Sequence, residues 1–334
     1  MVLESALAYL FVGFVGTGLV EFFVLQFAQS LRLLEEPNER SSHDVPTPSL
    51  GGLAILLPIV LLLSANLPTF PELEGLLIAA VAIGALGLLD DLVGLPSVPR
   101  LIVQSGCVAL ALWPLLPDLG IPLFVLAAVL SLWHVNLFNF MDGIDGFAGA
   151  QAFSVAVMLL VLAPTMAPWL GYLCCVLCGA SLGFLVYNWS PARIFMGDVG
   201  SLLLGLLYAV AAVLLWLDAY LTLPALLIAL AGFWVDATYT LAVRILTRQR
   251  FFAAHRSHAY QRLALRHGHG AVAWRLVALN FGWLLPLAWL ADQLALLGWG
   301  VLAVAVAPLL WLCNNLCAGA PETAASDRQT HVTL

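Results

Sequence analysis

Eleven apolar stretches follow one another along the chain, separated by short polar connections. They cover residues 5–27, 50–66, 75–90, 100–116, 121–138, 147–163, 168–187, 199–217, 221–243, 272–290 and 294–312. Each is close to the ~20 residues that a helix needs to cross a bilayer, a few being short. Because a segment in lipid must satisfy its own backbone hydrogen bonds, the pattern predicts an all-α polytopic membrane protein with about 11 transmembrane helices.

The composition agrees with this pattern. Of the 334 residues, 63% are hydrophobic and 9% are charged, whereas soluble proteins carry roughly 25% charged residues. We expect one integral-membrane domain over residues 1–317. The small, polar residues 318–334 predict a disordered C-terminal tail.

The basic residues predict the orientation. All 12 are arginines, which excludes a Walker A loop and a Schiff-base lysine. Every arginine falls in an odd-numbered connection or in the tail. By the positive-inside rule, the N-terminus is outside, and the odd connections and the C-terminus are cytoplasmic.

One odd connection holds a polar run. It reads N-L-F-N-F-M-D-G-I-D-G-F-A-G over residues 136–149, with Asn139, Asp142 and Asp145 three residues apart. If this run is helical, the three side chains share one face. Carboxylates beside so much hydrocarbon are costly unless they bind something.

Further chemically competent residues fall in the odd connections as well. They are Asp90 and Asp91, Asp198 in F-M-G-D-V-G-S, and His255 and His258 in H-R-S-H. Aspartate and asparagine oxygens suit Mg²⁺ or Mn²⁺, and the arginines of the ninth connection suit phosphate. Each motif alone is also typical of a simpler feature. The Asp90-Asp91 pair alone could be a solvated helix end, the D-G-I-D-G run a turn, and the arginines of the ninth connection topology signals. Together they predict metal-assisted phosphoryl transfer at the cytoplasmic face.

In this order, these motifs resemble those of the polyprenyl-phosphate N-acetylhexosamine-1-phosphate transferases. The segment R-S-S-H-D-V-P-T-P-S-L-G-G at 40–52 resembles the first cytoplasmic loop of that family. The resemblance implies transfer of a sugar-1-phosphate from a UDP-N-acetylhexosamine to undecaprenyl (polyprenyl) phosphate with release of UMP. It also implies a Mg²⁺ cofactor (or Mn²⁺), a bacterial inner membrane and no nucleic-acid partner.

The resemblance also implies residue roles. Asp198 matches the metal-binding aspartate of the family, and Asn139 and Asp142 match its neighbours. The catalytic residues would be Asp90, Asp91, Asp142 and Asp145, and substrate would contact Arg193, His255, Arg256, His258 and Thr47. Asp145 and the two histidines match positions near the nucleotide.

The segment A-H-R-S-H-A-Y-Q at 254–261 resembles the branch that initiates O-antigen and other surface polysaccharides. Ser257 stands where other branches have a further histidine, and Arg256 would contact phosphate in its place. The sugar stays open between GlcNAc and a 6-deoxy relative such as FucNAc or QuiNAc.

Secondary transporters and cation channels also carry acidic residues in a membrane domain. Such a protein would place its acids near the bilayer midplane, often with repeats, whereas these acids cluster at one face. G-A-S-L-G at 179–183 matches a nucleophile elbow, but small residues four apart inside a span favour close helix packing. Asp236 lies within a span and is either functional or a hydrogen-bond partner of a neighbouring helix.

Overall fold

A computed structural model describes residues 3–31, 34–35, 47–249 and 255–321, and these are almost entirely helical. The elements are α1 (Leu3–Leu31), β1 (Leu34–Glu35), β2 (Thr47–Pro48), α2 (Gly51–Asn66), α3 (Leu73–Val93), α4 (Ser97–Leu112), η1 (Trp113–Leu115), α5 (Leu116–Phe140), α6 (Phe147–Leu162), α7 (Pro168–Asn188), α8 (Gly197–Leu217), α9 (Leu223–Ala229), α10 (Ala231–Leu246), α11 (Ala259–His267), α12 (His269–Leu279), η2 (Asn280–Leu284), α13 (Leu285–Gln293), η3 (Ala295–Leu297) and α14 (Gly298–Asn315). The two strands form a short antiparallel pair. The prediction of an all-α membrane protein is confirmed.

The expected count of eleven spans is not confirmed. Every apolar stretch is mainly helical, but in the described residues only seven helices are long and apolar enough to cross a membrane, or eight if α9 and α10 form one bent span. Two causes lower the count. Helices α2 and α6 have only 16 residues each, and the 44 residues from Ser97 to Phe140 count as one segment although the backbone of Gly120 (φ 65°, ψ 165°) is not helical and kinks the chain at the expected connection.

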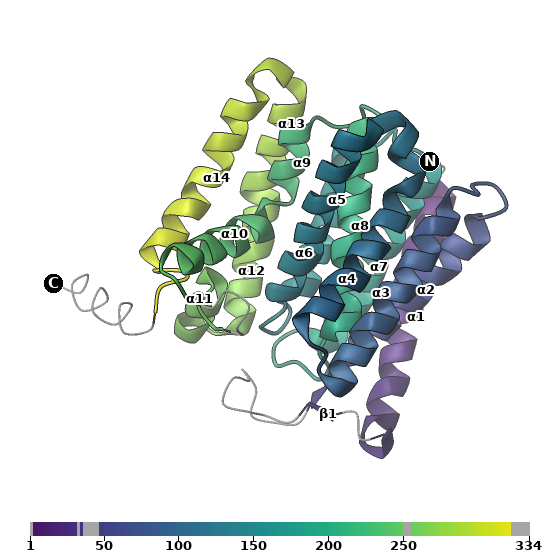
Figure 1. Cartoon of the computed structure of the whole chain (residues 1–334). Coiled ribbons are helices and arrows are strands. Elements are labelled where there is room, and N and C mark those ends of the chain that lie inside the picture. Colours follow the sequence, from purple (N-terminus) through teal and green to yellow (C-terminus); the bar gives the residue numbers. More distant parts are fainter. Residues whose placement is uncertain (1–2, 32–33, 36–46, 250–254, 322–334) are drawn as a thin grey trace.

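Helix α9 ends at Ala229 and the chain turns by 82° into α10. Consequently α10 lies across one end of the bundle instead of continuing along it, and α11 lies beside it (Figure 1). That end also holds the C-terminal end of α3, the α5–α6 turn and the N-terminal end of α8. The bend therefore brings the histidine segment to the end of the bundle where the acidic motifs lie.

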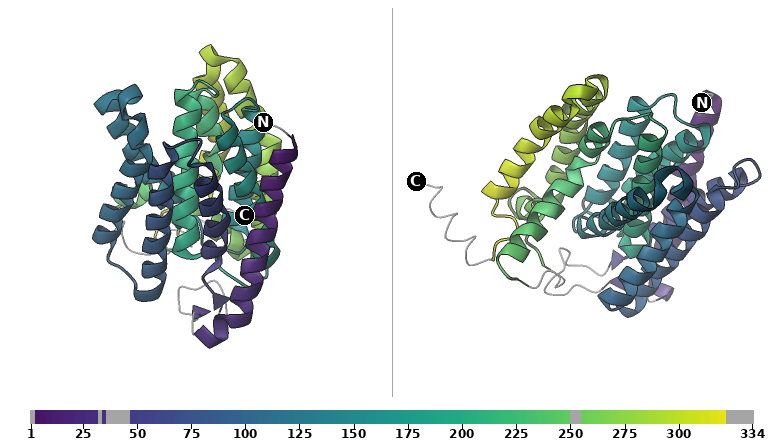
Figure 2. Two further views of the ribbon diagram at one scale, coloured as in Figure 1. Left: turned by 90° about the vertical axis from the view of Figure 1, so that its right-hand side faces the viewer. Right: turned by 45° about the horizontal axis from the view of Figure 1, so that its top comes forward.

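Helix α1 packs along α7 through small residues. A Cβ at Gly179 would lie 2.0 Å from the backbone oxygen of Leu10, and one at Gly183 would lie 2.5 Å from that of Phe14. Only glycine allows the two backbones to come so close. The predicted packing role of residues 179–183 is confirmed. Figure 2 shows α1 running along the outside of the bundle toward the end that holds β1.

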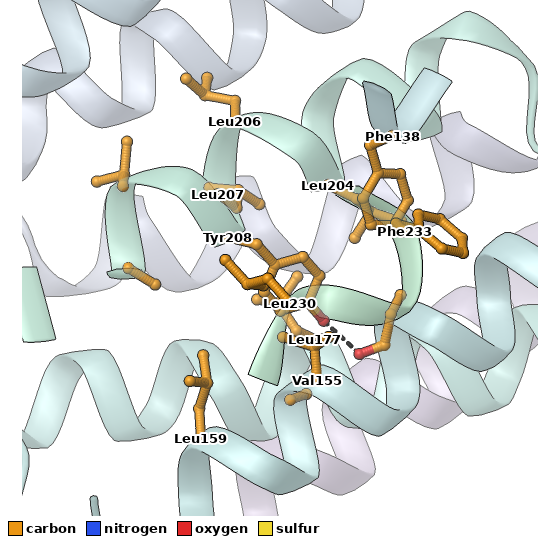
Figure 3. Close-up of a cluster of buried hydrophobic side chains, with 14 of the residues drawn as sticks. Phe138, Val155, Leu159, Leu177, Leu204, Leu206, Leu207, Tyr208, Leu230 and Phe233 are labelled. Atoms are coloured by element: carbon orange, nitrogen blue, oxygen red, sulfur yellow. Dashed lines mark hydrogen bonds between the residues drawn. The ribbon is translucent and has the colours of Figure 1, made fainter. Parts of the chain in front are cut away.

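The core lies between α5, α6, α7, α8 and α10. Phe138 stacks near Tyr208 and Phe233, with ring centroids 6.2 and 5.0 Å away (Figure 3). The Tyr208 hydroxyl donates to the backbone oxygen of Ala152, which satisfies the one polar group of this cluster. This packing fixes α5 against α8, the two helices whose ends carry Asn139 and Asp198.

The expected tail begins with ordered residues. Gly319 N donates to Ser257 O over 2.8 Å, and Arg262 Nη2 donates to Ala320 O over 2.7 Å. Residues 318–321 therefore pack against the segment that precedes α11 and against α11 itself. Residues 322–334 lie outside the described residues, as do residues 40–46 of the first expected loop.

Candidate active site

Two aspartates meet around one arginine. Asp90 and Asp91 lie near the C-terminal end of α3, and Gly94 (φ +66°) then ends the helix so that α4 brings Arg100 back to Asp90. The Arg100 guanidinium contacts the Asp90 carboxylate, and its Nη2 lies 3.4 Å from Asp198 Oδ2. Leu95 N donates to Asp90 Oδ1 over 2.6 Å. A cation between a buried carboxylate and a half-buried one offsets their mutual repulsion.

The first turn of α8 is held by α3. The backbone N–H of Asp198 donates to both carboxylate oxygens of Asp91, over 3.0 and 3.1 Å. A carboxylate is stabilising there because the first N–H groups of a helix lack partners within it. Asp91 therefore acts as a cap that fixes where Asp198 lies.

Gly197 makes this contact possible. Its φ is +68°, and a Cβ there would lie 2.3 Å from Ser49 O and 2.6 Å from Asp91 Oδ2. The first residues of α2 also lie along the α7–α8 loop: Gly51 N donates to Phe195 O and Gly52 N donates to Met196 O. The start of α2 thus supports the cluster from a third side.

Asn139, in the last turn of α5, completes the cluster. Its Nδ2 donates to Asp198 Oδ1 over 2.7 Å and contacts Ser201 Oγ at 3.0 Å. The sequence-predicted neighbours Asn139 and Asp198 are brought together, although they are 59 residues apart. The amide nitrogen faces Asp198, so in this structure Asn139 orients the carboxylate.

The expectation that Asn139, Asp142 and Asp145 share one helical face is wrong. Helix α5 ends at Phe140, and Asp142 and Asp145 lie in the turn before α6. Gly146 (φ +74°), directly before α6, has the left-handed conformation. Asp145 Oδ2 instead accepts from Ala192 N, 3.2 Å away.

A residue outside the predicted set holds Asp145. His269 Nδ1, at the start of α12, lies 3.3 Å from Asp145 Oδ1. Burial opposes ionisation of Asp145, but the hydrogen bond and charge of His269, with the Ala192 N–H, outweigh it and lower the pKa of this carboxyl below its usual value.

The histidine segment is anchored by Asp236 of α10. The carboxylate accepts from Ala259 N (3.0 Å) and Tyr260 N (2.9 Å), the first two N–H groups of α11, and Oδ1 lies 3.4 Å from His258 Nδ1. Of the two roles open to Asp236, the structure favours the hydrogen bond to a neighbouring helix. Its effect on the site is indirect, through His258.

His255 stacks on His258, with centroids 5.0 Å apart, and its Nδ1 lies 2.9 Å from Ser257 Oγ. Burial, with the nearby positive charges of His258 and Arg244, lowers the pKa of His255 to about 3. It is therefore neutral at pH 7 and can contact substrate only through hydrogen bonds, not as a cation.

Tyr260 connects the histidine segment to the aspartate turn. Its hydroxyl donates to Phe140 O over 3.0 Å, and a Cβ at Gly143 would lie 2.3 Å from the hydroxyl oxygen. Burial and the negative charges of Asp236 and Asp142 raise the pKa of Tyr260 well above its usual value. The hydroxyl stays protonated and holds the start of the turn.

Three predicted substrate contacts lie elsewhere on this end. The Arg193 side chain lies 5.0 Å over the Tyr187 ring and donates to Val186 O, so it folds against α7. Arg256 is exposed ahead of α11, and Thr47 is buried in β2. Contact of any of the three with substrate stays a prediction.

The donor set fits a hard cation. Within the described part of the chain, no group of three or more His, Cys, Asp or Glu residues is arranged as a metal site. The converging oxygens come from Asp90 and Asp198, and the Asn139 amide nitrogen orients the Asp198 carboxylate. Mg²⁺ uses few protein carboxylates because it retains waters and binds substrate phosphates. These residues therefore fit Mg²⁺ or Mn²⁺ bound together with a diphosphate.

Sequence reasoning missed two members of the site. Arg100 was interpreted only as a topology signal, although it is the first arginine after the Asp90-Asp91 pair. His269 was not predicted, although it lies in H-G-H-G at 267–270. A histidine between two glycines at the start of a helix was the signal that could have indicated it as a site residue.

Comparisons with known proteins show which family the chain resembles. The model of glycosyl transferase family 4 matches residues 73–216, which run from α3 to α8 and include Asp90, Asp91, Asn139 and Asp198. The histidine segment lies outside the matched residues.

Several curated bacterial proteins are similar over more of the chain. A probable undecaprenyl-phosphate N-acetylglucosaminyl 1-phosphate transferase of Bacillus subtilis is 30% identical over 261 residues, 72% of each chain. A decaprenyl-phosphate N-acetylglucosaminephosphotransferase of Mycobacterium leprae is 29% identical over 80% of this chain and 77% of its own. A phospho-N-acetylmuramoyl-pentapeptide-transferase of Nostoc punctiforme is 32% identical over 68% and 69%, respectively.

Proposed function

The chain belongs to glycosyl transferase family 4, whose sugar-1-phosphate transferases act on polyprenyl phosphate, and we propose that it transfers N-acetylhexosamine-1-phosphate from a UDP-sugar to undecaprenyl phosphate. The products are UMP and a polyprenyl-diphosphate sugar. The observation that carries this proposal is the convergence of Asp90, Asp198 and Asn139 around Arg100 at one end of a membrane bundle. Oxygen ligands and a fixed cation are what a diphosphate requires.

In the proposed reaction, an oxygen of the lipid phosphate attacks the β-phosphorus of the UDP-sugar. A new P–O bond forms there, and the bond between the β-phosphorus and the bridging oxygen breaks, so UMP leaves with that oxygen. A phosphate monoester is largely ionised at pH 7 and needs no strong base. Positioning and charge neutralisation supply most of the rate in such transfers.

The residues divide this work. Asp198, with Asn139 and Asp142, would hold Mg²⁺, which neutralises charge on the diphosphate and the leaving UMP. Asp91 fixes the backbone of Asp198, and Arg100 supplies a permanent positive charge beside Asp90. His258, kept in place by Asp236, and the neutral His255 are positioned as hydrogen-bond partners for the donor nucleotide.

The proposal includes the placement in the cell. The arginine distribution supports an active site on the cytoplasmic face of a bacterial inner membrane, an outside N-terminus and about eleven crossings. The A-H-R-S-H-A-Y-Q segment at 254–261 supports a role in initiating O-antigen or another surface polysaccharide.

A transfer assay tests the proposal. Purified protein with undecaprenyl phosphate and Mg²⁺ is incubated with radiolabelled UDP-GlcNAc, UDP-FucNAc and UDP-QuiNAc, and lipid-linked label and UMP are measured. We expect one donor to label the lipid, and EDTA, Asp198→Asn and Asp142→Asn each to lower the rate by at least 100-fold, about 2.7 kcal/mol in the barrier. The exposed Asp218, at the C-terminal end of α8, provides the control Asp218→Asn. Failure of every donor would overturn the proposal, and full activity of both site variants would overturn the metal role.

A further inference from the structure

His269 is the first residue of α12 and follows Gly268 (φ +80°), where the chain leaves α11. Its side chain is 18% exposed and its partner Asp145 is 14% exposed, so the pair is largely shielded from water. The pair joins two segments 124 residues apart. A contact that is partly buried and so distant in sequence ties α12 to the α5–α6 turn.

The imidazole contacts two atoms of the same residue. Nδ1 lies 3.3 Å from Asp145 Oδ1 and 3.4 Å from the backbone nitrogen of Asp145. One ring nitrogen cannot donate and accept at once. With a proton, Nδ1 donates to the carboxylate; without it, Nδ1 accepts from the backbone N–H. In either state His269 restrains Asp145.

The restrained turn is continuous with the α7–α8 loop. Asp145 Oδ2 accepts from Ala192 N, and Gly146 N donates to Asn188 Oδ1 over 2.9 Å. Asn188 Nδ2 in turn donates to Ile194 O over 2.8 Å, three residues before the start of α8. His269 is therefore the α12 end of a chain of contacts that reaches the loop leading to Asp198.

We propose that His269 is a positioning residue for the UDP-sugar donor, acting through the Asp145 carboxylate; this rests on the proposed function. The pair lies at the ends of helices, where the turn at residues 142–146 and the loop at residues 189–194 meet the first residue of α12, on the side from which a water-soluble nucleotide would approach. The lipid phosphate arrives from the membrane, along the helices. Loss of His269 therefore weakens use of the donor and leaves use of the lipid unchanged.

The test separates the two substrates. His269→Leu should raise the KM for the active UDP-sugar about tenfold and leave the KM for undecaprenyl phosphate within twofold. His269→Asn, whose amide can donate to Asp145 from near the Nδ1 position, should recover part of the loss. His267→Leu is the matched control, because His267 is exposed at the end of α11, two residues away.

A double-mutant cycle identifies the partner. If His269 acts through Asp145, His269→Leu should have little further effect on the donor KM in the Asp145→Asn background. Additive effects, or an equal rise in both KM values, would overturn the inference while wild-type activity upholds the proposed function. An inactive wild type would overturn the proposed function, and the inference with it. Should His269→Leu fold poorly in a melting assay, the cycle is completed with His269→Asn and gives the same decision.

Discussion

Asp236 gives the sharpest prediction, because one buried carboxylate holds the start of α11. It accepts two backbone N–H groups of the first turn, Ala259 and Tyr260, and a hydroxyl from Thr240. The change Asp236→Asn keeps the volume but replaces one oxygen with an NH₂ group. One of the two N–H groups then faces a donor and loses its partner.

The magnitude follows from the bond that is lost. A hydrogen bond to a charged acceptor contributes about 1.5–3 kcal/mol, and an unpaired buried donor costs about 1–3 kcal/mol. We expect Asp236→Asn to destabilise the protein by about 3 kcal/mol. At roughly 2 °C per kcal/mol for a chain of this size, the melting temperature should fall by about 6 °C.

Melting of the detergent-solubilised protein measures this, with Asp218→Asn as the exposed control. Activity measured below the melting temperature should fall, chiefly through the donor KM, because His258 loses its partner on α10. An unchanged melting temperature with abolished activity would refute the anchoring role, since it would assign Asp236 to the chemistry itself. Unchanged stability and activity would refute the reasoning altogether.

Three further predictions follow from the site. Gly197→Ala should lower both stability and activity, because the new Cβ would meet backbone and carboxylate oxygens. Gly94→Ala is the control: Gly94 has nearly the same φ but lies in open space, so the change should cost only the ~1–2 kcal/mol of a left-handed alanine and keep activity. Melting temperature and UMP release check both variants. Arg100→Gln should reduce UMP release at least tenfold by removing the cation beside Asp198, with Arg100→Lys intermediate, and full activity in both would contradict its role. Burial lowers the pKa of His255 to about 3 in the folded protein, against a usual 6.5, so protonation below pH 6.5 favours the unfolded chain. When the pH falls from 7 to 5, the melting temperature of the wild type should therefore fall further than that of His255→Asn. Equal falls in the two proteins would contradict this prediction.

The sequence alone determined the class of protein and indicated most of the candidate site residues. Long apolar stretches in lipid can only be helices, so the all-α fold was predictable from composition and period. Asp90, Asp91 and Asp198 were predictable as candidates because carboxylates in so apolar a chain must be compensated, and Asn139 because it lies in the same polar run as Asp142 and Asp145. Gly179 and Gly183 likewise indicated close packing, which α1 provides.

The tertiary structure decided how these residues are connected. That Asp91 caps the helix of Asp198, that Arg100 lies between two carboxylates and that Asp236 holds α11 all depend on contacts between distant segments. Local spacing cannot encode them. The same limit explains the error at residues 139–145: a spacing of three fits a helical face, but α5 ends at Phe140, and the turn beyond it carries Asp145 to Ala192 and His269. Helix ends and long-range partners are fixed by packing, whereas residue identity fixes only which partners each side chain needs.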